Sequence, residues 1–518
     1  MAYSQAHTAM ETFALIRRRP AIFVAALSML PSLVGNRRGI GLSWDSTDYI
    51  AVGLSMSAGR GALDVTGQPM VIRPPGLSAF VTLGDWLAIS PDISLRAVNA
   101  LSMAVIVWCT HHLLGRAGVQ ALSRWIGVAI VALSPALLDI FTMAWSEPPF
   151  IALTLVALLI ATRERTWHWE FVLAVLFTAM FFVRYVGPFY AAPLALVAAL
   201  VQVRRSGWYL ALLRAGTALS VSMVLPWLWL MRNKEISGYL TGYREAGGGT
   251  LLDPLKTFTG TLGSWLIARP PLLDGDIYLN WNDFSLYPKV AGVTTWLVTA
   301  GLVITFFAAR NRSRDSNIIV GASLFLLVFY GGFSIYRFVY DEMGPLDSRM
   351  MSGLYVPLVV LLTICADRVA SARPNGSPLR ARAIGKVLVA VALLIVGWHS
   401  VTTSRDALRY GDSGRYWGSV NHKIQPIHLF VQDLAERDVL FSNEPQSLFA
   451  ATFRWPIRNQ FLRDRPHLLP CDHRYFVWYN ETFLPDGKPT GAEVVFEDST
   501  AQVLDLGTCD SDIERFWP

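Results

Sequence analysis

The chain has few charged residues and few cysteines. Only 16% of its 518 residues are Asp, Glu, Lys or Arg, whereas 53% are hydrophobic. Soluble domains carry charge on about a quarter of their residues, so this composition excludes an ordinary soluble protein. It predicts a membrane protein that crosses the bilayer many times.

The four cysteines fall into two groups. Cys109 and Cys365 lie inside hydrophobic segments, which predicts buried and inert thiols. Cys471 and Cys509 lie in a polar C-terminal region and could form a disulfide if that region is outside the cytoplasm.

Other absences narrow the class. No small-residue cleavage site follows the first apolar run, so the arginines at 17–19 are expected to precede an uncleaved first helix. No internal repeat and no low-complexity run is visible. The formal net charge of +6 comes from short basic clusters between apolar runs, and we expect no nucleic-acid partner.

Eleven apolar runs predict about eleven transmembrane helices, because a bilayer needs roughly 20 residues of helix per crossing. The runs lie near residues 20–34, 93–114, 122–141, 148–162, 171–186, 187–203, 209–231, 290–309, 316–335, 350–367 and 386–400. Arginine clusters fall in every second connection, which is the positive-inside pattern of cytoplasmic loops. We therefore expect a protein of the cell (inner or plasma) membrane with a cytoplasmic N-terminus and an extracytoplasmic C-terminus.

Three further segments are not expected to span the membrane. Residues 47–58 are expected to form a helix lying on the membrane, capped by Ser46 or Thr47 and ended by Gly59. Residues 75–90 are too short and polar for a span and predict an interfacial or re-entrant helix. Residues 401–518 predict a small extracytoplasmic α/β domain with one helix near 445–452, beside a membrane domain of residues 1–400.

Two aspartates in the first external loop are the leading candidates for chemistry. Asp45 and Asp48 lie in the segment Trp44-Asp45-Ser46-Thr47-Asp48-Tyr49. The dipole of a helix starting here would keep Asp45 ionised, and a carboxylate at the membrane surface can act as a general base. Alternatively, both aspartates only cap and solvate the helix.

Further charges are predicted on the same side of the membrane. Arg73 precedes Pro74-Pro75 and either reaches the lipid headgroups or grips a phosphate. Glu147 opens the predicted fourth span, and Arg184-Tyr185 ends the fifth. These residues form either a buried pair that orients helices or the polar wall of an outward-facing cavity.

Taken together, the motifs resemble the GT-C superfamily of polyprenyl-phosphate-sugar-dependent glycosyltransferases, in the branch with protein O-mannosyltransferases and the lipid A aminoarabinose transferase. The family's first loop carries an Asp four residues before a Tyr, then a helix ending in Gly, then a basic or aromatic residue before Pro-Pro. Over about residues 10–400 the matching positions, in order, are Asp45, Tyr49, Gly59, Arg73-Pro74-Pro75, Ser146-Glu147, Arg184-Tyr185, Pro226-Trp227 and Arg232-Asn233.

The resemblance implies inverting transfer of a hexose or pentose from a polyprenyl-phosphate carrier to a lipid, glycan or protein acceptor on the outer face. Asp45 would be the general base. Asp48 would be the second carboxylate, because Ser46 stands where many relatives have Glu. Arg73 would stabilise the donor phosphate, with Arg337 and Arg349 of the 336–349 loop as further candidates.

Three points are left open by the sequence. No His stands near the acidic motif, so the metal site of some relatives is not carried over and no cofactor is assigned. The 232–289 loop, with its glycines at 247–249 and Trp265, is either a mobile lid or an ordinary interfacial loop. The alternative function is a transporter or flippase of lipid-linked or anionic substrates, although transporters more often contain inverted repeats.

Overall fold

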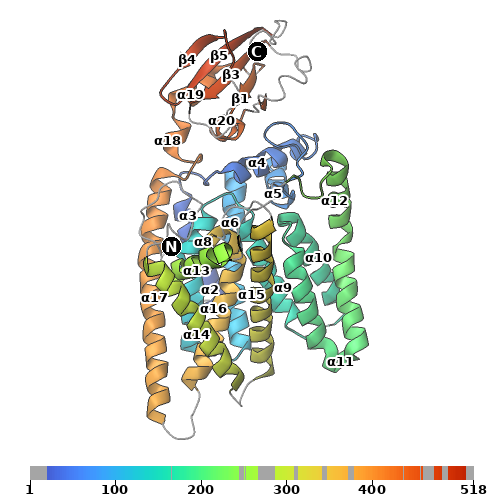
Figure 1. The fold of residues 1–518 in the computed structure, drawn as a ribbon, viewed down its shortest axis with the longest axis vertical. Helices are drawn as coiled ribbons and strands as arrows, with labels where there is room; N and C mark the ends of the chain where they lie inside the picture. Colours follow the sequence, from blue (N-terminus) through green and yellow to red (C-terminus); the bar gives the residue numbers. More distant parts are fainter. Residues whose placement is uncertain are drawn as a thin grey trace, which may run out of the picture.

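The computed structural model describes residues 20–164, 166–243, 250, 252–266, 286–308, 313–340, 347–371, 378–435, 437–454, 457–458, 472–480 and 488–508. Within these ranges, a bundle of long helices carries a small sheet at one end (Figure 1). The predicted fold class, a polytopic helical membrane protein with a small α/β part near the C-terminus, is confirmed.

The helices of the bundle follow the predicted apolar runs, except for Leu252–Leu266, which lies in the predicted 232–289 loop. The first group comprises α2 (Pro20–Leu27), α3 (Leu30–Gly35), α6 (Pro91–Arg116), α7 (Ala121–Ala132), α8 (Pro135–Phe141), α9 (Glu147–Ala161), α10 (His168–Val183), α11 (Pro188–Ser222) and α12 (Val224–Ser237). The second group comprises α13 (Leu252–Leu266), α14 (Leu286–Ala308), α15 (Arg314–Tyr340), α16 (Ser348–Ser371) and α17 (Pro378–Ser413).

The predicted number of eleven spans is not confirmed. Among the described residues, six helices are long and apolar enough to cross a membrane, or seven if the bent pair α7 and α8 is one span. The apolar helices at 20–35, 147–161 and 168–183 are shorter than a crossing requires. The two spans predicted between 187 and 231 lie in one apolar stretch, Pro188–Ser237, whose helix α11 is broken at Gly207 with φ 74° and ψ 165°.

Two short helices lie across the end of the bundle that faces the sheet (Figure 1). They are α4 (Trp44–Ser57) and α5 (Gly76–Trp86), and they pack against each other. Both helices were predicted, but the start of α4 differs: it begins at Trp44, and Ser43 holds the N-cap position with extended backbone. Ser46 and Thr47 therefore lie inside the helix, and neither caps it.

The loop predicted at 336–349 is also shorter than expected. Arg337 lies in the last turn of α15 and Arg349 lies in the first turn of α16, because both apolar runs continue as helix through their polar ends. Asp347 is the capping residue of α16: its Oδ1 accepts a hydrogen bond of 2.9 Å from the Met350 amide.

Four of the predicted cytoplasmic connections meet at the opposite end of the bundle, through arginines of two of them. Arg116 donates to the Thr162 carbonyl at 2.8 Å and pairs with Asp315 at 3.4 Å, while Arg368 donates to the Ala117 carbonyl at 2.8 Å. These connections therefore share one end, as the alternation of arginine clusters predicts. Which side of the membrane this end faces stays a prediction.

The C-terminal part forms a five-stranded sheet in the order β2-β1-β3-β5-β4. Its helices and strands are α18 (Val420–Lys423), α19 (Pro426–Asp433), β1 (Val439–Ser442), α20 (Pro445–Thr452), β2 (Ile457–Arg458), β3 (His473–Tyr479), β4 (Glu493–Glu497) and β5 (Ala501–Thr508). The predicted domain boundary at 400/401 falls within α17, and the division stays a prediction. Cys471, Cys509 and residues 247–249 lie outside the described residues.

The sheet region is packed directly on the surface helix α4. Phe449 and Ala450 of α20 share a hydrophobic core with Tyr49 and Ile50 of α4, and all four side chains are buried. The sheet and the first loop therefore lie at the same end of the bundle, as predicted.

A small parallel ladder fixes the start of α4. Residues 40–42 lie between two other segments, since Gly41 bridges to Met143 and Leu42 bridges to Tyr416. The Ala144 amide donates to the Gly41 carbonyl at 2.9 Å, and the Trp417 amide donates to the Leu42 carbonyl at 3.2 Å. A side chain at position 41 would collide with the backbone carbonyl of Thr142 as well as with the Met143 side chain, so glycine is required there. The ladder places the two acidic motifs, at 45 and 147, side by side.

Candidate active site

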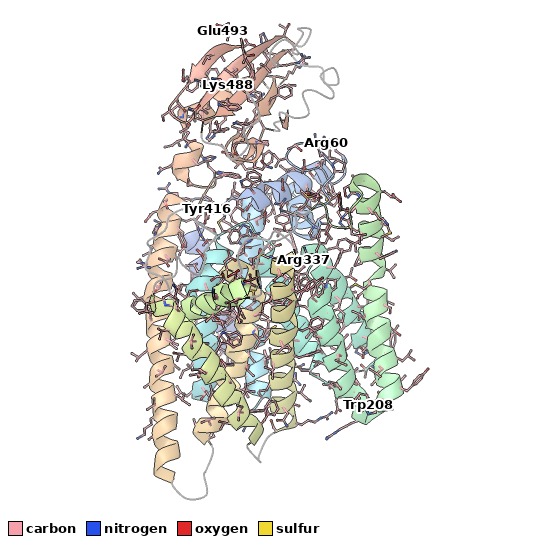
Figure 2. The ribbon with its side chains drawn as sticks, viewed as in Figure 1. Arg60, Trp208, Arg337, Tyr416, Lys488 and Glu493 are labelled. Carbon is pink, nitrogen blue, oxygen red and sulfur yellow. The ribbon has the colours of Figure 1, made fainter. Side chains whose placement is uncertain are left out.

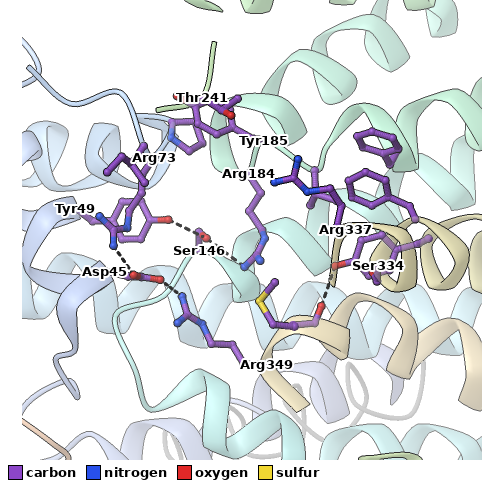
Figure 3. Close-up of a pocket in the computed structure, with 17 residues that line it drawn as sticks. Asp45, Tyr49, Arg73, Ser146, Arg184, Tyr185, Thr241, Ser334, Arg337 and Arg349 are labelled. Carbon is purple, nitrogen blue, oxygen red and sulfur yellow. Dashed lines mark hydrogen bonds and ion pairs between the residues drawn. The ribbon is translucent and has the colours of Figure 1, made fainter. Parts of the chain in front are cut away.

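Asp45 lies in the first turn of α4 and is held by two arginines from distant parts of the chain. Arg73 Nη2 donates to Asp45 Oδ1 at 2.6 Å, and Arg349 Nη2 contacts Asp45 Oδ2 (Figure 3). Its side chain stays 26% exposed, so a reacting group can reach it. Burial acts to raise the pKa of Asp45, but the charges of Arg349 and Arg73 outweigh it and hold the pKa well below its usual range.

The second aspartate of the motif behaves differently. Asp48, one turn further along α4, pairs with Nη1 of Arg73, so one guanidinium bridges both carboxylates. Burial raises the pKa of Asp48 to about 7, more than the Arg73 charge lowers it. Asp48 does not line the cavity described below; it lies behind Arg73 and fixes that side chain.

A buried acid from α9 organises the other side of the site. Glu147 is 1% exposed and lies at the start of α9, where Pro148 and Pro149 begin the helix. It pairs with Arg184, and it accepts from Arg349 Nε at 2.8 Å. Arg349 therefore bridges Asp45 and Glu147, and its guanidinium also lies 4.2 Å from the centroid of the Trp145 ring.

A cavity of about 370 Å³ opens between these groups. Its described lining carries four arginines and one carboxylate: Arg73, Arg184, Arg337, Arg349 and Asp45. The charge balance favours an anionic ligand, and the volume is in the range of small-molecule sites. Figure 2 places Arg337 at the end of α15 that lies nearest to α4.

The cavity combines the charged groups with hydroxyl and apolar side chains. Tyr49 donates to Ser146 Oγ at 3.2 Å, and Arg184 Nη1 is 3.5 Å from the same oxygen. Burial raises the pKa of Tyr49 to about 12, so it stays a neutral hydrogen-bond donor. On the apolar side, the rings of Phe189 and Phe333 are stacked with centroids 3.5 Å apart. The site thus has a charged half and an apolar half.

Sequence reasoning selected eight residues, and the structure gathers them around one cavity. Six line it: Asp45, Arg73, Arg184, Tyr185, Arg337 and Arg349. Asp48 and Glu147 stand behind the lining arginines. Sequence reasoning did not single out Tyr330, Ser334 and Thr241, which also line the cavity and carry no motif in the sequence.

Two other expectations concern a metal and a lid. Within the described ranges, no group of three or more His, Cys, Asp and Glu side chains could hold a metal ion. The predicted 232–289 loop contains helix α13, whose Trp265 is buried and donates from Nε1 to Ser348 Oγ at 3.2 Å. Trp265 is thus packed against the start of α16, next to Arg349.

No protein-family model and no curated protein sequence matches the chain. Solved structures do match it. ArnT from Cupriavidus metallidurans, bound to undecaprenyl phosphate, is similar with a TM-score of 0.59 and 13% identity over 93% of this chain and 97% of ArnT. The apo state of ArnT gives a TM-score of 0.60, 13% identity and coverages of 96% and 98%.

The arabinofuranosyltransferase AftD from Mycobacteria is also similar, with a TM-score of 0.54 and 15% identity. It is matched over 96% of this chain but only 40% of its own length. The fold is GT-C-like. The resemblance suggested by the scattered motifs is therefore confirmed at the level of the fold. In this fold, α4 lies at the end of the bundle that faces the sheet, with α5 packed against it, and Asp45 of α4 lines the cavity (Figures 1 and 3).

Proposed function

We propose that the protein is an inverting glycosyltransferase that moves a hexose or pentose from a polyprenyl-phosphate carrier to an acceptor on the extracytoplasmic face. One observation carries the proposal. A carboxylate held ionised by two arginines faces a cavity whose described lining holds four guanidiniums. One site can therefore bind a phosphate through its arginines and supply a carboxylate as the base for the acceptor.

The arginines match the change of charge during the reaction. The donor is a phosphodiester with one negative charge, whereas the departing polyprenyl phosphate is a monoester that gains a second one. Arg73, Arg337 and Arg349 therefore attract the leaving group more strongly than the bound donor, which lowers the barrier. Arg184 is held by Glu147 and supports the same side of the cavity.

Asp45 takes the proton of the acceptor. The acceptor hydroxyl or amine attacks the anomeric carbon from the face opposite the phosphate, the bond from that carbon to the phosphate oxygen breaks, and its electron pair leaves with the phosphate. This single displacement inverts the anomeric configuration. When the donor phosphate draws Arg73 or Arg349 toward itself, an oxygen of Asp45 is released and the carboxylate becomes more basic.

The lipid part of the donor fits the apolar half of the site. Phe189 and Phe333 lie on α11 and α15, so they are placed to contact the first isoprene units beside the phosphate. The solved structure of ArnT with undecaprenyl phosphate supports a carrier of this class. The rival function, a flippase, is less well supported because ArnT and AftD, which share the fold, are glycosyltransferases.

The test uses purified protein in lipid nanodiscs with a synthetic polyprenyl-phosphate monosaccharide and an envelope extract as the source of acceptor. We expect transfer of the sugar, release of polyprenyl phosphate, and a product whose anomeric proton shows inversion by NMR. Movement of the donor across proteoliposome membranes without transfer would refute the proposal and favour the flippase. The absence of both activities with a panel of hexose and pentose donors would refute it as well.

A further inference from the structure

Tyr185 lines the cavity, but its hydroxyl group is already engaged by other protein groups. We propose that Tyr185 is a positioning residue that acts on the donor phosphate through Arg73, and that Trp229 and Asn233 of α12 share this role. The inference rests on the proposed function and deepens it.

The hydroxyl of Tyr185 has three protein partners. It donates to the Val71 carbonyl at 2.9 Å, and it accepts from Trp229 Nε1 and from Asn233 Nδ2, each at 2.9 Å. A phenol has one donor and two acceptor lone pairs, so these contacts use its full capacity. The hydroxyl is therefore committed to the protein, although the ring faces the cavity.

The contacts converge on the segment that carries Arg73. Asn233 is fully buried and also donates to the Leu240 carbonyl at 3.1 Å, which fixes its amide. Arg232 donates to the Met70 carbonyl at 3.0 Å, while its guanidinium lies 4.4 Å from the centroid of the Trp229 ring. The Met70 carbonyl is thus tied to α12 by Arg232, and the Val71 carbonyl is tied to it through Tyr185 and directly by Asn233 Nδ2 at 3.4 Å.

The segment is also restrained on its other side. Pro74 and Pro75 follow Arg73 and restrict the backbone there. At Gly76 a side chain would collide with the backbone of Phe182 in α10, so the chain passes closely by α10 at this point. Between these anchors, the Arg73 fork has one orientation, with one nitrogen on Asp45 and the other on Asp48. A small shift of the segment would misplace the guanidinium.

The positioning role makes a prediction that a direct role does not. Trp229 and Asn233 do not line the cavity, yet they hold the same hydroxyl as Val71. If Tyr185 acts through Arg73, Trp229→Phe and Asn233→Leu should reproduce the effect of Tyr185→Phe. If Tyr185 contacts the donor itself, only Tyr185→Phe should matter.

The experiment measures the affinity for a short-chain polyprenyl phosphate by calorimetry, and kcat and KM for the matching donor. We expect each of the three variants to weaken phosphate binding roughly 3- to 10-fold, mainly through KM, as for the loss of one buried hydrogen bond. The matched controls are Trp227→Phe, an exposed indole two residues from Trp229, and Tyr239→Phe, an exposed phenol just after α12.

Double variants decide whether the effect passes through Arg73. In an Arg73→Ala background, Tyr185→Phe and Trp229→Phe should cause little further loss, because coupled residues are non-additive. Full additivity, or binding by Trp229→Phe equal to that of Trp227→Phe, would overturn the inference. Trp229→Phe removes only one of the three hydrogen bonds of the Tyr185 hydroxyl. It therefore provides the test if the Tyr185→Phe protein does not fold. Absence of binding and transfer in the wild type would instead count against the proposed function.

Discussion

Two polar clusters at the same end of the molecule differ in charge and in access to a cavity, and this difference distinguishes a candidate reaction site from a structural network. Around Asp45, charged side chains surround a cavity of about 370 Å³. At the base of the C-terminal sheet, the second cluster is made of neutral groups that satisfy each other. We call it the sealed cluster, and it consists of His422, His428, Ser447 and Tyr479.

The sealed cluster has a closed set of hydrogen bonds. His428 is fully buried, its Nδ1 donates to the His422 carbonyl at 2.7 Å, and its Nε2 accepts from the Tyr479 hydroxyl at 2.7 Å. Burial lowers the pKa of His428 and lowers that of His422 to about 4, so both rings are neutral at physiological pH. None of its four residues lines the Asp45 cavity.

The comparison shows that burial of titratable groups does not by itself make a site. The Asp45 cluster carries net charge beside an open volume, and its arginines can exchange a carboxylate for a phosphate. The sealed cluster has no such exchange to offer, because a ligand would have to break neutral bonds without gaining a charged one. We therefore expect a reaction only at the cluster where a ligand can replace the existing hydrogen-bond partners.

The largest effect among the flanking residues is expected for Arg349→Ala. This change removes the bridge between Asp45 and Glu147 and leaves the part-exposed Asp45 and the buried Glu147 with fewer partners. Transfer should fall on the order of 10²-fold or more, measured per folded molecule after gel filtration. Arg368→Ala, at the other end of α16, is the control. Near-normal transfer by Arg349→Ala would contradict the view that the Asp45 cluster, unlike the sealed cluster, is needed for transfer.

A somewhat smaller loss is expected for Arg73. Its fork reaches Asp45 and Asp48 with separate nitrogens, which a Lys ammonium cannot reproduce. Donor binding should weaken about 10- to 100-fold in Arg73→Ala, and Lys should restore only part of it. The exposed arginine at position 60 provides the control, Arg60→Ala. Equal donor affinity in wild type, Lys and Ala variants would take Arg73 out of the phosphate site.

The pKa of Asp48, raised to about 7, predicts a pH effect on stability. The Asp48 carboxyl loses its proton more readily in the unfolded chain than in the folded protein. The free energy of unfolding therefore falls as the pH rises from about 4 to 7. Asp48→Asn removes this penalty. Its Tm relative to wild type should therefore increase by a few degrees between pH 5 and pH 8. Asp85→Asn, at an exposed position of α5, is the control. A difference in Tm between Asp48→Asn and wild type that does not change with pH would contradict the assigned pKa.

The smallest effect on transfer is expected in the sealed cluster. His428→Leu removes one hydrogen bond from the Tyr479 hydroxyl and one from the His422 carbonyl, which costs about 1–3 kcal/mol of stability. Tm should fall, while transfer per folded molecule stays within about twofold of wild type, as expected for a structural network. His473→Leu, at the part-exposed start of β3, is the control. A loss of transfer comparable to that of Arg349→Ala would show that the sealed cluster takes part in the reaction.

The sequence was sufficient for features that depend on local pattern. Apolar runs predicted most helices within a few residues, and Gly59 correctly ended α4. The polar motifs at 45, 73, 147 and 184 were predicted on one side of the membrane, and the structure brings them together around one cavity. These features depend on the spacing of apolar residues and the positions of charged residues, and both can be read from a single sequence.

Features that depend on tertiary packing were not predictable. Arg349 meets Asp45 across 304 positions, and no local signal marks that contact. The ladder that joins residues 40–42 to 143 and 416 is equally remote in sequence. Sequence reasoning also placed Arg337 and Arg349 in a loop, because charged residues at the ends of apolar runs look alike whether the helix stops before or after them. The predicted number of eleven spans was not confirmed, since short helices and a break at Gly207 divide the apolar runs differently among the described residues.

The central claim is that Asp45 accepts the proton of the acceptor, and Asp45→Asn tests it most directly. Asn keeps the size of the side chain and hydrogen bonds to both arginines are retained in part, so donor binding should be maintained. We expect kcat to fall on the order of 10²-fold or more, while the affinity for polyprenyl phosphate stays within about threefold of wild type. Asp85→Asn serves as the matched control. Wild-type kcat in Asp45→Asn would contradict the claim.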